Sequence, residues 1–164
     1  MKTFAPFALI AALLVLTGCP YSSEISLTPG RTANAQFLSG GWDSSGDDYS
    51  EAEHYDISVG KDQQLSIVKS GSEDGSVVNY KGYLSDIEGT LFLNVHEEVE
   101  PGVEPMYYFY KIDKTSDTEF VLFEVTENIR ERFGKPEEMV KFFRENMHLS
   151  FFYTAGEVTY YKKS

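Results

Sequence analysis

The sequence predicts a mainly β domain, an antiparallel up-and-down barrel or sandwich of about eight or nine strands with one late amphipathic helix. Two observations carry this prediction. After residue 36, short segments rich in Tyr, Phe, Val, Ile and Leu follow one another, and each is closed by turn-forming residues. Near the C-terminus, over about residues 136–147, the apolar spacing changes once to the three- and four-residue period of a helix.

The first 18 residues are predicted to be an export signal. Lys2 supplies a positive charge, and residues 4–17 are uncharged and mostly apolar. This run is too short for a membrane span, which needs about 20 apolar residues. It ends in Leu16-Thr17-Gly18-Cys19, which resembles the lipobox of bacterial lipoproteins. The resemblance implies cleavage before Cys19, diacylglycerol on its thiol and an acyl chain on its amino group. The alternative is an ordinary thiol beside a conventional cleavage site, which predicts a soluble exported product.

Cys19 is the only cysteine, so the chain can form no internal disulfide. Lipidation at Cys19 would hold the protein on a membrane durably, because anchoring by two or more chains is far stronger than by one. In Gram-negative lipoproteins, aspartate directly after the cysteine is the usual signal for inner-membrane retention. Pro20 stands there instead. We therefore expect a cell-envelope protein on the periplasmic face of the outer membrane, in preference to the inner membrane.

Composition narrows the function of the exported part. Removal of the signal leaves 146 residues, enough for one domain. Only Lys2 is lost among the charges, so 13 basic side chains face 26 acidic ones, a formal net charge of −13. Nucleic-acid binding depends on clustered Lys and Arg, so a nucleic-acid partner is excluded. Residues 19–36 are rich in Ser, Thr, Pro, Gly, Asn and Ala and predict a flexible tether before a domain over 37–164.

The first clear pair of strands, which follows the segment around residues 40–42, forms a hairpin. Tyr55, Ile57 and Val59 alternate with polar residues, and a turn at residues 60–62 leads into an apolar segment over 65–68. Alternation of this kind predicts one buried face.

The next strands cover residues 78–85 and 91–95. Gly82 in the middle of the first of them predicts a bend or the close approach of another backbone. The acidic segment 96–105 then leads to strands at 106–112 and 120–123, which are apolar on both faces. We expect each side of these two strands to be covered.

Pro136 and the two glutamates after it begin the helix, because proline suits its first position and acids suit its N-terminal dipole. The helix carries an apolar stripe of Met139, Phe142, Phe143 and Met147. This stripe is expected to pack on the protein's own sheet, and the alternative is docking on a partner. Two last strands are predicted at Leu149–Tyr153 and Val158–Tyr161, with a turn at residues 155–156.

Gly40-Gly41-Trp42, at the start of the first strand, resembles the Gly-x-Trp motif of lipocalins. The resemblance implies a lipocalin-like barrel in which Trp42 plugs one end. An eight-stranded barrel either is filled by side chains or holds one small ligand. Trp42, Tyr80, Tyr108 and Tyr110 are therefore candidate ligand-binding residues, and the alternative is that they only pack the core.

Motifs for catalysis, metals and cofactors do not occur. The three histidines, His54, His96 and His148, lie on separate segments, and no Gly-x-Ser-x-Gly or phosphate-binding glycine pattern is present. We therefore expect no catalytic residues, no metal and no cofactor. The first expectation is a non-enzymatic, membrane-anchored module for a small apolar or amphipathic ligand. The alternative is an acidic lipoprotein that binds an envelope protein as an accessory subunit or inhibitor.

Overall fold

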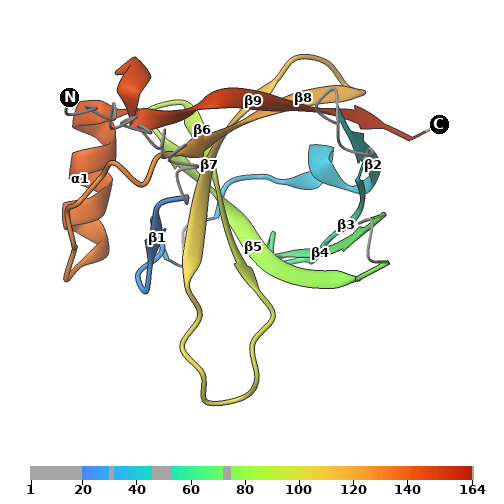
Figure 1. Ribbon diagram of the computed structural model, residues 1–164, viewed down its shortest axis with the longest axis horizontal. Coiled ribbons are helices and arrows are strands. Elements are labelled where there is room, and N and C mark those ends of the chain that lie inside the picture. Colours follow the sequence, from blue (N-terminus) through green and yellow to red (C-terminus); the bar gives the residue numbers. More distant parts are fainter. Residues whose placement is uncertain (1–19, 30–31, 46–52, 72–74, 164) are drawn as a thin grey trace, which may run out of the picture.

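Eight antiparallel strands close into a barrel in the computed structural model of this chain, which describes residues 20–29, 32–45, 53–71 and 75–163 (Figure 1). The barrel strands are β2 (Gly40–Ser44), β3 (His54–Val59), β4 (Leu65–Ser70), β5 (Val78–Ile87), β6 (Thr90–Glu97), β7 (Tyr107–Lys114), β8 (Glu119–Val125) and β9 (Tyr153–Lys162). Each strand pairs with the next along the chain, and β9 pairs with β2. The predicted up-and-down topology with one late helix is confirmed, as a barrel and not a sandwich. The expected signal segment and Cys19 lie outside the described residues.

Strict alternation along the strands separates the inside of the barrel from the outside. On β7, Tyr108, Tyr110 and Ile112 contribute to the interior core, whereas Tyr107 and Phe109 belong to a second core on the outer face. The predicted hairpin is confirmed too, because Tyr55 and Ile57 of β3 face inward beside Ile67 of β4. The period of two residues is what allows a single strand to serve both cores.

One end of the barrel is closed by residues 33–39, which include the short 3-10 helix η1 (Gln36–Leu38). The backbone N–H of Ala35 donates to Gln63 Oε1 at 2.9 Å, in the loop between β3 and β4. Leu38 is buried in the interior core, and its carbonyl accepts a 2.7 Å hydrogen bond from Trp42 Nε1. The other end of the barrel carries the longer loops, including the β6–β7 loop that extends downward in Figure 1.

Residues 20–29 pack against the outside of the barrel. Tyr21 and Leu27 are buried in the outer core, and the two-residue strand β1 (Ser22–Ser23) pairs with the first residues of β7. On its other side the segment contacts β8, where the N–H of Tyr21 donates to the carbonyl of Val125 at 3.0 Å. The segment thus joins β7 and β8 at the open end. This differs from the flexible tether expected over residues 19–36, because two large apolar side chains supply the burial that the polar composition conceals.

The helix α1 (Pro136–Asn146) lies between β8 and β9 in sequence and covers the same side of the barrel as β1 (Figure 1). Met139 and Phe143 are completely buried, and the Phe143 ring meets Phe92 edge to face at 5.3 Å and Phe109 at 5.6 Å. The stripe therefore packs on the protein's own sheet, as expected. The helix also packs on the apolar outer face of β7, which was predicted to be covered.

Gly82 in the middle of β5 lies against the backbone of β6. A Cβ atom at this position would come within 2.4 Å of the carbonyl oxygen of Asn94. The predicted close approach of a second backbone is confirmed, because only glycine leaves the space that this contact requires.

The C-terminal region differs from its prediction in one respect. Residues 150–152 form a 3-10 helix, η2 (Ser150–Phe152), and a single strand, β9, follows it. The strand expected over Leu149–Tyr153 and the turn at residues 155–156 are therefore wrong. Gly156 lies inside β9 with a φ of +110°, where the register between β8 and β9 shifts between Phe123 and Val125, so the chain bulges here and does not turn back.

Candidate ligand cavity

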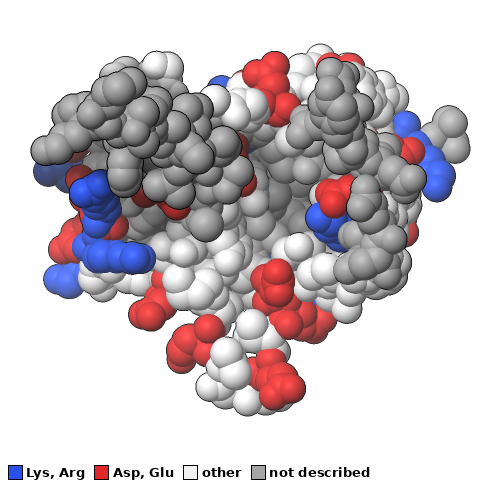
Figure 2. Space-filling model, in the orientation of Figure 1, with Lys and Arg blue, Asp and Glu red and all other residues white. Residues whose placement is uncertain are grey.

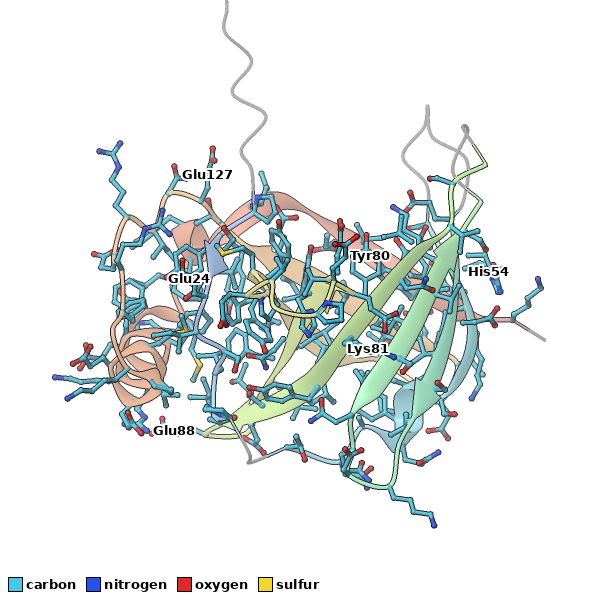
Figure 3. The ribbon with its side chains drawn as sticks, turned by 90° about the horizontal axis from the view of Figure 1, so that it is seen from below. Glu24, His54, Tyr80, Lys81, Glu88 and Glu127 are labelled. Atoms are coloured by element: carbon cyan, nitrogen blue, oxygen red, sulfur yellow. The ribbon has the colours of Figure 1, made fainter. Side chains whose placement is uncertain are left out.

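A cavity of about 180 Å³ lies inside the barrel, at the end opposite η1. Its lining comes from the inward-facing positions of β3 to β9 and consists of Tyr55, Ile67, Lys69, Tyr80, Leu93, Val95, Tyr108, Tyr110, Leu122 and Tyr160. Antiparallel order explains how they meet, because the first residues of β3, β5 and β7 lie at the same barrel end as the last residues of β4 and β6. In Figure 3, Tyr80 lies in the middle of the view and His54 at the outer edge.

Trp42 lies toward the closed end and is not part of this lining. Its ring is buried and meets Phe120 edge to face at 4.6 Å. Phe120 in turn stacks on Tyr160 at 4.8 Å, and Tyr160 is a wall of the cavity. A continuous column of aromatic rings therefore joins the closed end of the barrel to the cavity.

One charged pair belongs to the cavity wall. Lys69 Nζ lies 2.6 Å from Glu53 Oε1, and the Tyr55 hydroxyl donates a 2.6 Å hydrogen bond to Glu53 Oε2. Burial opposes the ionisation of Glu53, but the hydrogen bonds from Lys69 and Tyr55 outweigh burial and hold its pKa below the usual value. The charge of Lys69 is thus matched within the wall.

The hydroxyls of Tyr80, Tyr108 and Tyr110 make no hydrogen bond with any side chain or backbone group in the described part of the chain. Each can donate one hydrogen bond and also accept. Burial raises the pKa of Tyr110, and the nearby Glu124 carboxylate raises it further. Burial also raises the pKa of Tyr80, against an opposing effect of Lys69. These two phenols therefore stay protonated at neutral pH.

Glu124 is a second acidic group on the inside of the barrel. It continues the inward-facing series of β8 after Phe120 and Leu122, and it lies opposite Tyr110 in the β7–β8 register. Thr154 Oγ1 donates to it at 3.0 Å. Burial raises the pKa of Glu124, and the hydrogen bond from Thr154 offsets part of this effect.

Of the four tyrosine and tryptophan residues singled out from the sequence, the structure brings Tyr80, Tyr108 and Tyr110 together in one cavity and leaves Trp42 in the core. Sequence reasoning missed Lys69 and Tyr55. The signal was there, since Lys69 is in phase with Leu65 and Ile67 on the apolar face of its strand. A lysine on the inward-facing, otherwise apolar side of a strand indicates that the barrel interior contains a polar group.

The three histidines lie apart from the cavity. His54 is on the outer face of β3, with Nδ1 at 2.8 Å from Asp43 and Nε2 at 3.4 Å from Asp56. His96 hydrogen-bonds to the Glu97 carbonyl. Among the described residues, no three metal-ligating side chains are arranged to hold an ion.

Within the described ranges, no helix is both long enough and apolar enough to cross a membrane. In comparisons with known proteins, no family model matches the chain, and neither the curated proteins nor the solved structures include a significant match.

Proposed function

We propose that this chain is a non-catalytic binding protein of the cell envelope, anchored to a membrane through acyl chains on Cys19, which holds a small apolar or amphipathic molecule in its barrel. One observation carries the binding part: a cavity with mostly apolar walls contains three tyrosine hydroxyls without hydrogen-bond partners among the described residues. Ligand pockets combine apolar lining with a few such polar groups. No buried side-chain polar atom of the described residues lacks a hydrogen-bond partner, so the three hydroxyls are accessible from outside, and a ligand that enters the cavity can pair with them.

The size of the cavity restricts the ligand. A cavity of roughly 150 Å³ in another protein holds a benzene molecule. The 180 Å³ here therefore suits one ring with a small substituent and is too small to enclose a long acyl chain.

A matched pair of variants on β4 tests binding in the cavity. Ile67→Phe fills the cavity, because Ile67 lines it, whereas Val68→Phe places the same side chain on the outer face. The full-length protein is isolated from its native membranes and examined by native mass spectrometry. A co-purifying small molecule that is present in the wild type and in Val68→Phe, and lost in Ile67→Phe, supports the proposal. Absence of any bound molecule in the wild type contradicts it.

The anchor is supported by the order of charged start, apolar segment and Leu16-Thr17-Gly18-Cys19, together with the lack of any other cysteine. Pro20 bridges to Thr126 at the end of β8, so a lipid on Cys19 would be attached one residue from the rim of the barrel. The test is the mass of the mature N-terminal peptide and the membrane fraction of the wild type against Cys19→Ser. An unmodified Cys19 contradicts the anchor without affecting the cavity. We place the anchored protein on the periplasmic face of the outer membrane.

A second function is favoured by the β6–β7 loop, where acidic side chains surround exposed apolar ones (Figure 2). Glu98, Glu100 and Glu104 are exposed there, and Val103 is 55% exposed. Such a surface suits a basic envelope protein. Cross-linking in intact cells, followed by pull-down at low and high salt, tests it: a stoichiometric partner that dissociates at high salt and is lost in a Glu98→Gln/Glu100→Gln/Glu104→Gln variant supports this function.

A further inference from the structure

Charged groups stand on two walls of the barrel interior, the paired Lys69 and Glu53 on one and Glu124 on the other. Lys69 lies on β4 and Glu124 on β8, and in the closed order of eight strands these two are four positions apart in both directions. They therefore stand on opposite walls. Lys69 lines the cavity directly, and Glu124 lies beside Tyr110, which does.

We infer that the cavity selects an uncharged, dipolar single-ring molecule that lies across the barrel, with its hydrogen-bond-accepting end toward Lys69 and Tyr80 and its donating end toward Glu124 and Tyr110. This inference rests on the proposed ligand-binding function and specifies the chemistry of the ligand.

The accepting end is directed by the donors of one wall. An ammonium group has three N–H donors, and Lys69 uses one of them on Glu53 at 2.6 Å. The Tyr80 hydroxyl, on the neighbouring strand, adds a further donor. A carbonyl or ether oxygen of the ligand placed here would accept from both groups without displacing Glu53.

The donating end is directed by the acceptors of the other wall. Glu124 accepts one hydrogen bond, from Thr154, and a carboxylate can accept about four. The Tyr110 hydroxyl has no hydrogen-bond partner in the described residues and can accept as well. A hydroxyl or amide N–H of the ligand would therefore find acceptors on this side.

A full charge on the ligand is disfavoured for either sign. A carboxylate directed at Lys69 competes with Glu53, which already holds the ammonium, and the negative charge of Glu124 on the opposite wall repels it. An ammonium directed at Glu124 meets Lys69. Since a desolvated charge without its own partner is strongly unfavourable, the neutral molecule of the same size binds best.

Three probes of one shape test the inference. The probes are para-hydroxybenzamide, para-hydroxybenzoate and para-hydroxybenzylammonium, which share a ring and a hydroxyl and carry a neutral, negative or positive group at the other end. Their affinities for the full-length chain in phosphatidylcholine vesicles are measured by titration calorimetry, with toluene as an apolar probe and protein-free vesicles as the blank. We expect the amide to bind at least about tenfold more tightly than either ion.

Two variants then shift the selectivity in opposite directions. Glu124→Gln removes the charge that repels the anion, so it brings para-hydroxybenzoate closer to the amide and leaves the cation behind. Lys69→Met does the reverse and favours the cation. Lys81→Met is the matched control, because Lys81 follows Tyr80 on β5 and donates to Ser66 Oγ at 2.8 Å on the outer face. It leaves all three affinities unchanged.

The results separate the inference from the proposed function. Equal affinity for the three probes, or tighter binding of either ion by the wild type, overturns the inference and leaves a ligand cavity in place. No binding of any probe, toluene included, overturns both.

Discussion

The side-chain oxygen of Asn94 accepts a 2.8 Å hydrogen bond from the backbone N–H of Leu27, which lies 67 positions earlier in the chain. Asn94 is fully buried on the outer face of β6, and its amide nitrogen donates to Ser85 Oγ at 2.9 Å. Ser85 and Tyr83 both donate to the Leu27 carbonyl. A single polar cluster therefore holds the N-terminal segment against the barrel.

Replacement of Asn94 by alanine is expected to destabilise the protein by about 2 to 4 kcal/mol, since it leaves the Leu27 N–H buried without an acceptor and opens a small void. Urea unfolding of the full chain, followed by Trp42 fluorescence, measures the change. Asn128→Ala is the control on an exposed site and should change stability by less than about 0.5 kcal/mol. An equal effect of the two variants would show that the cluster contributes nothing specific.

Deletion of residues 20–31 is expected to expose the outer core. Tyr21 and Leu27 each contribute about 1.5 to 3 kcal/mol of burial, and the deletion also uncovers Phe109, whose ring lies 5.9 Å from Tyr21. A chain that begins at Thr32 should unfold at lower urea than one that begins at Pro20 and should bind more of an apolar dye. Equal stability of both chains would mean that the segment is indeed a tether.

Gly82→Ala is expected to destabilise the barrel by about 1 to 3 kcal/mol, because its Cβ would lie 2.4 Å from the Asn94 carbonyl oxygen and the two strands would have to separate. Gly134→Ala is the matched control, since no atom outside its own residue and its two chain neighbours lies within 4 Å of its added Cβ. The midpoint temperatures of thermal unfolding of both variants, compared with that of the wild type, measure the difference. A neutral Gly82→Ala would contradict the close approach of β5 and β6.

Glu53 should make the protein lose stability in acid. Its pKa in the folded state is held below the usual value, so its ionised form stabilises the fold above the ordinary carboxyl pKa, and this contribution disappears as the pH falls through the lowered folded pKa. Urea unfolding at a series of pH values from neutral to acid measures the slope. Glu53→Gln should flatten it, and an unchanged slope would contradict the role of the Glu53–Lys69 pair.

Glu124 should change the stability of the protein with pH in the opposite direction from Glu53. Burial raises its folded pKa, so the protonated group is favoured in the fold, and stability falls as the pH rises through that raised value. Glu124→Gln, which keeps the shape and can still accept from Thr154, should therefore be more stable than the wild type at neutral pH. The difference should vanish in acid. A less stable Glu124→Gln at neutral pH would contradict this assignment.

The barrel topology and the helix were predictable because both follow from local periodicity. Alternation in β3 and the stripe of α1 reflect which side chains face away from water, and this needs no knowledge of distant residues. Gly82 was predictable for a similar reason. The outer core could be predicted only in part. The apolar outer face of β7 indicated that other residues pack on it, but the sequence pattern did not show that Tyr21 and Leu27 would be among them.

The cavity depended on how the barrel closes. Three of its tyrosines were identified from the sequence as candidates, yet Lys69 and Glu124 stand on opposite walls because β9 returns to β2, a pairing between segments more than a hundred residues apart. Local patterns show which face of a strand is buried. Shear, closure and the packing of residues 20–29 between β7 and β8 decide how much space remains inside and which polar groups meet there.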